Sequence, residues 1–219
     1  MSEGSDRLIY FFRDPLPGFT KKRLASTIGD QNAATIYRAM IEDLYKRFQR
    51  FPIPIHPMHR EDTSLEFPAW EPAGSQEGRD LGARMERAFE RLFDEGANRI
   101  ILMGSDIPSL TTQIVSDCFR KLLNKPVCIG PSADSGYYLI GFQKTSFLPG
   151  VFRNISWSSN NVLDATLAVI RRAELNLHIA PTLLDIDTRD DLTSWAAQQP
   201  SSLRNPRLGT VWKEISDKL

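Results

Sequence analysis

The sequence predicts an α/β protein with a mostly parallel β-sheet covered by helices on both faces. Short apolar runs of strand composition alternate with longer segments in which apolar residues recur at helical spacing. Parallel strands need crossover connections, which helices supply in such folds. The 219 residues suit one large domain, and 41% hydrophobic with 25% charged residues is ordinary for a globular protein.

The first third of the chain predicts a strand, a helix, a second strand and a loop. Residues 8–12 are a continuous apolar run with the length and residue types of a buried strand. Residues 53–57 predict a short strand that their prolines weaken. Residues 60–77 show no period and predict a long loop, and such loops are often functional. Residues 30–50 predict a helix with apolar positions at helical spacing: Ile36, Tyr37, Met40, Ile41, Leu44 and Phe48.

The middle of the chain continues the alternation. Residues 99–103, Arg-Ile-Ile-Leu-Met, predict a buried strand, and residues 127–129 and 137–142 predict two more. Residues 111–123 predict a helix that begins near a threonine, a common N-cap residue. Residues 80–94 predict a helix with one apolar face: Leu81, Met85, Ala88, Phe89, Leu92 and Phe93.

The last third predicts two helices, at 160–173 and 189–197, with a strand at 177–184 between them. Beyond residue 198 the chain becomes polar and contains proline, with a short helix expected near 211–215. We therefore expect one domain over residues 1–198, followed by a C-terminal extension over residues 199–219.

Composition and charge exclude several classes of protein. The formal net charge is +0, which gives no general basis for binding nucleic acid or a membrane surface. No apolar run reaches the roughly 20 residues of a membrane span, and the polar start Met-Ser-Glu-Gly-Ser-Asp-Arg does not match a signal peptide. Cys118 and Cys128 lie in apolar surroundings and are expected to be buried and unpaired. We therefore expect a cytoplasmic protein that has neither a membrane nor a nucleic acid as a partner.

Several catalytic motifs are absent from the sequence. It contains no G-x-G-x-x-G, G-x-x-x-x-G-K-[ST], H-E-x-x-H or G-x-S-x-G pattern. Their absence argues against a dinucleotide-dependent dehydrogenase, a P-loop NTPase, a zincin metalloprotease and an ordinary serine hydrolase. The three histidines have no metal-ligand spacing and are expected to be structural or exposed.

The predicted topology indicates where a ligand binds. In open α/β sheets, ligands bind outside the carboxyl ends of the strands. Four stretches follow predicted strands at that edge: residues 13–23, 104–110, 130–136 and 185–190.

The first of these stretches has the composition of a phosphate-binding loop. Pro17 and Gly18 predict a rigid turn, and Lys21, Lys22 and Arg23 follow it. Glycine lets the backbone approach phosphate oxygens, and arginine binds two oxygens at once. The alternative is a surface turn with solvated charges.

Aspartates at two of the strand ends could hold a hard cation. Asp106 follows a buried strand directly, where it either binds a cation through oxygen or caps the next turn. Asp185 and Asp187 point to the same side of an extended stretch, and one of them could complete a Mg²⁺ site with Asp106. The alternative is helix capping at Thr188, and Asp190 and Asp191 favour the positive helix N-terminus in either case.

Three further stretches have two interpretations each. Asp134 and Gly136 lie between two strands, where they form a turn or approach a sugar or acceptor. Asp80 contacts a base or acceptor, or begins a helix. Trp157 forms a wall of the acceptor site or anchors a loop.

These motifs together resemble a family of bacterial transferases, the DUF2064 family, with relatives among nucleotidyltransferases that make nucleotide-activated cofactors and sugars. The family pattern is F-x-R-x-P-x-P-G-x-x-K-T-R-L, G-D-L-G-x-R-M, G-[ST]-D-x-P-x-L, D-G-G-Y-Y-L-I-G, W-S-T and D-[IV]-D-T-x-x-D-L. The matches occur in order, within residues 8–195. They lie at residues 11–24, 79–85, 104–110, 134–141, 157–159 and 185–192.

The resemblance implies a GT-A-like α/β/α sandwich, as in nucleotide-diphospho-sugar transferases, and a metal-dependent transferase with a nucleotide-activated donor. It implies a nucleotide or nucleotide-sugar as ligand, an acceptor that the residues do not identify, and Mg²⁺ or Mn²⁺ as cofactor. Glycosyl transfer is the leading expectation; nucleotidyl transfer from an NTP and a non-catalytic nucleotide-binding protein are the alternatives. The implied roles are donor binding by Arg13, Pro17, Gly18, Lys21, Arg23 and Asp80, metal binding by Asp106 and Asp187, and catalysis at Asp106, Asp134 and Tyr137.

The chain departs from the family pattern at four positions. Asp14 adds a negative charge beside the phosphate loop, and Lys22, where threonine is usual, offsets that charge. Ala133 replaces a common acidic residue, which removes a metal or acceptor contact, and Ser135 replaces a glycine.

Overall fold

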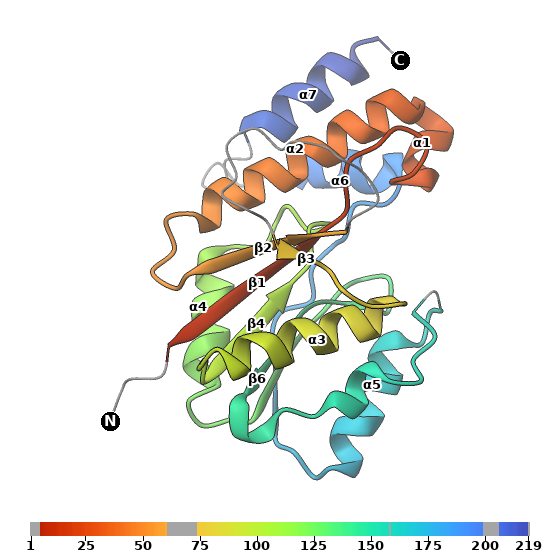
Figure 1. Cartoon of the computed structure of the whole chain (residues 1–219). Coiled ribbons are helices and arrows are strands. Elements are labelled where there is room, and N and C mark those ends of the chain that lie inside the picture. The colour runs from red at the N-terminus through yellow and green to blue at the C-terminus, as the bar shows by residue number, and fades with distance from the viewer. Residues whose placement is uncertain (1–4, 61–73, 158, 199–205, 219) are drawn as a thin grey trace.

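The computed structural model describes residues 5–60, 74–157, 159–198 and 206–218 (Figure 1). Over these residues the fold is α/β, as predicted, with a seven-stranded sheet in the order β3-β2-β1-β4-β6-β5-β7. The pairings are parallel except that β6 runs antiparallel to both β4 and β5. The strands are β1 (Asp6–Phe12), β2 (Ile55–His59), β3 (Gly74–Ser75), β4 (Arg99–Met103), β5 (Val127–Pro131), β6 (Tyr137–Gln143) and β7 (Leu177–Ile179).

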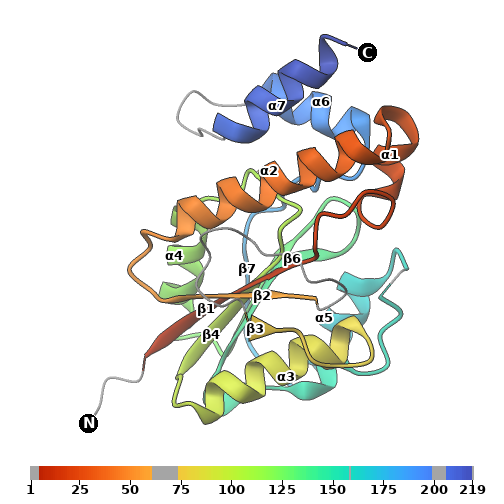
Figure 2. The same ribbon diagram turned by 45° about the horizontal axis from the view of Figure 1, so that its top comes forward.

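Helices cover both faces of the sheet (Figures 1 and 2). The α-helices are α1 (Lys22–Ile28), α2 (Asp30–Phe48), α3 (Leu81–Asp94), α4 (Thr112–Lys121), α5 (Val162–Arg172), α6 (Arg189–Gln198) and α7 (Pro206–Ser216). Two 3₁₀ helices, η1 (Lys144–Ser146) and η2 (Pro149–Phe152), follow β6. Within the described ranges, no helix combines the length and the apolarity that a membrane span requires.

Strand β1 separates two hydrophobic cores. Its alternate residues Leu8 and Tyr10 pack into a core shared with α1, α2, α4, α6 and α7. Ile9 and Phe11 point the other way, into a core shared with α3, α5 and η2. The sheet is therefore the middle layer of a three-layer sandwich, and this burial on both faces explains why β1 is a continuous apolar run.

Several boundaries differ from the expected ones for physical reasons. Strand β4 has the predicted bounds, but the strand expected at 177–184 ends at Ile179, since Pro181 has no N–H for the ladder. The cations after Gly18 do not all lie in a loop, because α1 begins at Lys22. Most of the loop expected at 60–77, namely residues 61–73, lies outside the described residues.

The C-terminal helix is longer than the short helix expected near 211–215. Helix α7 packs along α2 (Figure 2), and Leu208 is fully buried in the core. Asp43 of α2 accepts hydrogen bonds from the backbone N–H groups of Arg207 (3.4 Å) and Leu208 (2.9 Å), in the first turn of α7. Residues 199–205 of the expected extension lie outside the described residues.

Candidate functional site

A cavity of about 380 Å³ opens at the carboxyl ends of β1 and β4 and beside the turn between β5 and β6. All four stretches that the topology rule singled out contribute to its lining. The polar side chains among the lining residues include Arg13, Arg84, Asp106, Asp134, Asp185 and Asp187. Four carboxylates and two guanidinium groups in one cavity give it the capacity to bind both a cation and an anion.

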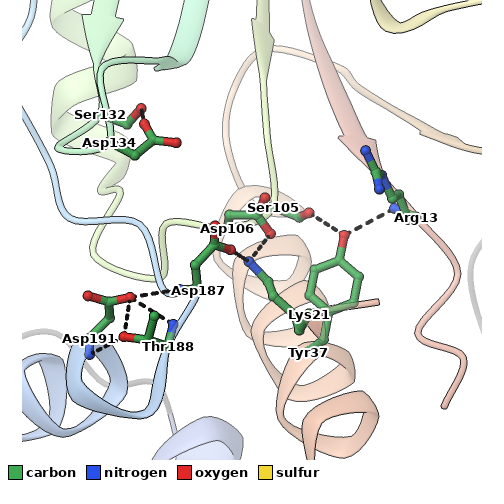
Figure 3. A network of polar contacts seen from close by, with 10 residues as sticks. All are labelled: Arg13, Lys21, Tyr37, Ser105, Asp106, Ser132, Asp134, Asp187, Thr188 and Asp191. Atoms are coloured by element: carbon green, nitrogen blue, oxygen red, sulfur yellow. Dashed lines mark hydrogen bonds and ion pairs between the residues drawn. The ribbon is translucent and has the colours of Figure 1, made fainter. Parts of the chain in front are cut away.

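Lys21, Asp106 and Asp187 form an ion cluster at one wall of the cavity (Figure 3). Lys21 Nζ lies 2.8 Å from Asp106 Oδ1 and 2.8 Å from Asp187 Oδ1. The Lys21 side chain is 5% exposed, whereas those of Asp106 and Asp187 are 50% and 37% exposed. The carboxylate oxygens are therefore no further apart than twice 2.8 Å.

Lys21 and the carboxylates beside it stabilise each other's charged forms. Burial acting alone would lower the pKa of Lys21, but the adjacent Asp106 and Asp187 carboxylates raise it above the ordinary value. Burial would likewise raise the pKa of Asp187, but the Lys21 ammonium outweighs it and holds that pKa below the ordinary value. Lys21 and Asp187 are therefore both charged at neutral pH.

Backbone contacts bring the two aspartates together from separate strand ends. Ile186 donates from its backbone N–H to the carbonyl oxygen of Asp106 over 3.0 Å. Arg47 of α2 donates through Nη1 to the carbonyl oxygens of Pro108 (2.8 Å) and Leu110 (2.5 Å). The loop that carries Asp106 is thus tied both to the stretch that carries Asp187 and to α2.

Thr188 and Asp191 form a reciprocal cap at the start of α6. Asp191 Oδ2 accepts from the backbone N–H groups of Asp187 (3.1 Å) and Thr188 (2.7 Å), and Asp191 N donates to Thr188 Oγ1 over 3.2 Å. The capping that was weighed for Thr188 is present, and together with Asp191 it fixes the backbone that carries Asp187.

Tyr37 joins the phosphate loop to the Asp106 loop, a role that the sequence analysis missed. Its hydroxyl lies 2.8 Å from Ser105 Oγ and accepts from the backbone N–H of Arg13 over 3.1 Å. Lys21 Nζ lies 5.5 Å from its ring centroid. The only sequence signal is a hydroxyl within the apolar face of α2, and burial raises the pKa of that hydroxyl to about 12.

Only some of the expected phosphate-binding residues lie at the cavity in the structure. Arg13 lines the cavity, whereas Pro17, Gly18 and Arg23 are exposed and lie outside its lining. Lys21 is ion-paired, and its backbone adopts the left-handed conformation (φ 49°, ψ 48°) directly before α1. For a residue other than glycine that conformation costs on the order of 1–3 kcal/mol.

Asp134 and Asp80 both make the local contacts that were weighed against ligand binding. Asp134 Oδ1 accepts from Ser132 Oγ (2.5 Å) and Gly136 N (2.9 Å), which closes the turn between β5 and β6, and the side chain also lines the cavity. Asp80 Oδ1 accepts from Ala83 N over 2.8 Å as the N-cap of α3, outside the cavity lining. The structure therefore places Asp80 at a helix start.

Tyr137 and Trp157 form a second wall of the cavity. Their rings meet edge to face, with centroids 6.3 Å apart. The hydroxyl of Tyr137 is buried, and that burial raises its pKa. The Tyr137 hydroxyl is therefore buried, although the residue itself contributes to the cavity lining. Ser158 lies outside the described residues.

Asp185 is a partly buried carboxylate in the cavity whose charge opposes folding. Burial, followed by the nearby Asp134 charge, raises its pKa from 3.8 to about 6. Because the folded state binds this proton more tightly than the unfolded state, the contribution of Asp185 to stability falls as pH rises from about 4 to about 6.

We expect Asp185→Asn to stabilise the protein above pH 6 and to leave its stability unchanged near pH 4. One pKa unit corresponds to about 1.4 kcal/mol, and solvent screening of this partly exposed group reduces the gain to roughly 1 kcal/mol. Thermal unfolding near pH 8 should show a melting temperature roughly 2–4 °C higher for the variant. An equal shift at both pH values would contradict the assigned cause.

The donor set at the ion cluster fits a hard divalent cation. Mg²⁺ is commonly held by one or two carboxylates together with substrate phosphates and water. Asp106 and Asp187 supply two converging carboxylates, whose Oδ1 atoms both lie 2.8 Å from the Lys21 ammonium. Over those residues no group of three or more His, Cys, Asp or Glu side chains forms a complete cage.

A fold of this type is shared by nucleotidyltransferases and nucleotide-diphospho-sugar transferases. A protein from Desulfovibrio desulfuricans G20, provisionally assigned as a nucleotide-diphospho-sugar transferase, is 34% identical with a TM-score of 0.90. The alignment covers 97% of this chain and 95% of that one. The family model for an uncharacterized protein conserved in bacteria (DUF2064) matches residues 57–159. The chain belongs to the DUF2064 family, as its motifs predicted.

More distant structures share the fold alone. Rv0371c from Mycobacterium tuberculosis H37Rv, in complex with manganese, has a TM-score of 0.51 at 14% identity, covering 89% of this chain and 98% of that one. CMP:2-keto-3-deoxy-manno-octonic acid synthetase, in complex with CTP, has a TM-score of 0.51 at 10% identity, covering 87% and 96%. No curated protein matches the sequence.

Proposed function

We propose that this protein is a metal-dependent transferase that uses a nucleotide-activated donor, with transfer of a glycosyl group from a nucleotide-diphospho-sugar as the leading reaction. The observation that carries the proposal is the convergence of Asp106 and Asp187 in a cavity at the carboxyl ends of the strands. The 34% identical relative, provisionally assigned as a nucleotide-diphospho-sugar transferase, supports it.

In this proposal the chain positions the donor and neutralises its charge. Asp106 and Asp187 would hold Mg²⁺ or Mn²⁺, which stabilises negative charge on the departing phosphate. Arg13, in the cavity lining, binds phosphate oxygens, and Arg23 on the first turn of α1 contributes a second positive charge. The exposed turn at Pro17 and Gly18 leaves backbone accessible to the donor.

The acceptor in this proposal binds at Asp134, Tyr137 and Trp157, which line the same cavity as Asp106 and Asp187. Asp134 is held by its own turn, with its carboxylate among the lining residues. The rings of Tyr137 and Trp157 supply an apolar surface for a sugar or another acceptor. In this arrangement Asp134 orients the acceptor, and the contribution of Tyr137 comes from its ring.

Nucleotidyl transfer from an NTP is the second candidate. It is favoured by the likeness to the synthetase whose structure contains CTP. The two reactions need the same metal and phosphate contacts and differ in the bond that breaks, at the anomeric carbon or at the α-phosphorus. Product analysis distinguishes them, because an NTP substrate releases pyrophosphate and a sugar donor releases a nucleoside diphosphate.

The direct test is thermal unfolding with a panel of NTPs, NDPs and NDP-sugars, with and without Mn²⁺. A ligand at about 100 times its Kd stabilises the native state by roughly 2.7 kcal/mol. Each kcal/mol moves the melting temperature of a chain of this size by about 2–4 °C. We therefore expect at least one panel member, with Mn²⁺, to raise the melting temperature by roughly 5–10 °C.

The metal-free arm and a turnover assay complete the test. The shift should shrink without metal, because the cation bridges the phosphates and the protein. A flat response over the whole panel, with and without Mn²⁺, would contradict the proposed function. A shift without product from any acceptor tried would favour a non-catalytic nucleotide-binding protein.

A further inference from the structure

The ammonium group of Lys21 lies where the proposed function places a divalent cation. Its Nζ contacts one oxygen of Asp106 and one oxygen of Asp187, each at 2.8 Å (Figure 3). Resting on the proposed function, we propose that Lys21 is an exchangeable internal cation. It neutralises the two carboxylates in the absence of metal and moves to the donor phosphates when a divalent cation binds the carboxylates.

Charge balance explains why the metal-free site needs this lysine. Asp106 and Asp187 converge from two strand ends, and a third carboxylate, that of Asp185, lines the same cavity. Like charges at this separation in a partly buried site are unfavourable. The 5% exposed Lys21 side chain supplies the positive charge that holds them together.

The ammonium and a divalent cation exclude each other at this position. A divalent cation bound to Asp106 Oδ1 and Asp187 Oδ1 would take the two atoms that Lys21 Nζ contacts, and the two positive charges would then lie within a few ångströms of each other. The Lys21 ammonium contacts Asp106 Oδ1 as closely as it contacts Asp187 Oδ1, at 2.8 Å in each case. The ion pair to Asp187 includes a hydrogen bond from Lys21 Nζ over 2.8 Å.

The backbone at Lys21 is in a strained conformation. Lys21 holds a left-handed conformation between an exposed turn and α1, and Gly18 in that turn has φ 79°. A lysine keeps such a conformation only when the surroundings enforce it. The start of α1 holds the backbone, through the hydrogen bond from Ala25 N to Lys21 O (2.8 Å), whereas the two carboxylates and the Tyr37 ring hold the side chain, so the loss of the carboxylates to a metal would free the side chain.

Once released from the carboxylates, the Lys21 ammonium can bind the donor phosphates. Arg13 lines the same cavity as Asp106 and Asp187, and Arg23 follows Lys21 by two residues, on the first turn of α1. Donor phosphates bridged to the metal would be bound there, and Lys21 would join the two arginines on them. Metal binding releases Lys21 from the two carboxylates, and the donor phosphates give Lys21 a new partner. Metal and donor binding are then positively coupled.

The experiment measures Mn²⁺ affinity in the absence of nucleotide, from the electron paramagnetic resonance signal of free Mn²⁺. Lys21→Met removes the charge but keeps most of the side-chain volume, and we expect it to bind Mn²⁺ roughly 5–150-fold more tightly than the unmodified protein, the usual range of coupling between sites. Lys22→Met, the matched control at the adjacent exposed lysine, should match the unmodified protein. Unchanged or weaker binding by Lys21→Met would overturn the proposal.

A second measurement does not depend on the folding of the variant. Crystals of the unmodified protein soaked with MnCl₂ should show the ion on Asp106 and Asp187, with Lys21 Nζ beyond ion-pair distance of both. Mn²⁺ bound elsewhere, or Lys21 still bridging the carboxylates at saturating Mn²⁺, would overturn the proposal.

Failure of this inference and failure of the proposed function give different results. Tighter Mn²⁺ binding by Lys21→Met with no response to any nucleotide supports the internal cation and contradicts the transferase. A nucleotide response in the unmodified protein with unchanged Mn²⁺ affinity in Lys21→Met supports the transferase and contradicts the internal cation.

Discussion

Asp106→Asn is expected to lower metal-dependent turnover of the donor by on the order of 100-fold or more. A metal ion contributes several kcal/mol of charge stabilisation in the transition state, and each 1.36 kcal/mol is a factor of ten in rate. The substitution removes one of the two carboxylates that would hold that metal. Steady-state rates with Mn²⁺ and the donor identified in the nucleotide panel give the measurement.

Asp190→Asn is the matched control for this loss. Asp190 is exposed in the first turn of α6, near the same edge of the sheet, and contributes nothing to the cavity lining. Its removal changes the net charge as much as Asp106→Asn does. Comparable rates for the two variants would show that general electrostatics, and not a metal held by Asp106, governs turnover.

Gly82→Ala is expected to destabilise the protein by roughly 1–3 kcal/mol, through overpacking. Gly82 lies buried in the first turn of α3, and a Cβ atom there would overlap the carbonyl oxygen of Phe152 and lie 2.8 Å from Trp157 Nε1. The backbone carbonyl cannot rotate away as a side chain would, so η2 and the indole must shift. The melting temperature should fall by roughly 2–12 °C.

Gly209→Ala provides the opposite case in another helix. A Cβ atom at Gly209 of α7 would meet nothing within 4 Å. Alanine is also the better residue in a helix interior, by roughly 0.5–1 kcal/mol. We expect this variant to unfold at a slightly higher temperature, and equal destabilisation by both substitutions would contradict the packing argument.

Displacement of Trp157 in Gly82→Ala should also weaken acceptor binding.

Sequence patterns within single helices and strands were sufficient to predict the α/β architecture. The apolar run of β1, the periodicity of α2 and the Arg-Ile-Ile-Leu-Met segment of β4 each depend on residues within one element. Burial on both faces requires such a run in a central strand, whatever the rest of the chain contributes. The strand-end rule then located the four stretches that contribute to the cavity lining, because it depends only on the direction and order of the strands.

The same local reasoning failed where a distant partner decides the role of a residue. Tyr37 belongs to an apolar helical face by spacing, and only the fold places its hydroxyl against Ser105 and the backbone of Arg13. Helix α7 was expected to be only a short helix in an extension. The contact that fixes its first turn, from Leu208 N to Asp43, joins residues 165 positions apart, and local sequence patterns do not show such contacts. The need for glycine at position 82 likewise comes from η2 and Trp157.

The sequence alone determined an α/β layered fold, its family, and the edge of the sheet where aspartates and cations gather. It could not decide which of three adjacent cations pairs with those aspartates, because Lys21, Lys22 and Arg23 carry the same charge in the same stretch. The tertiary structure decided it: the left-handed backbone at Lys21 turns that side chain inward, to a partner 166 positions away, while α1 carries Lys22 and Arg23 into solvent. The physical reason is that charge is a property of the residue, whereas burial and pairing are set by crossover connections that bring distant strand ends together.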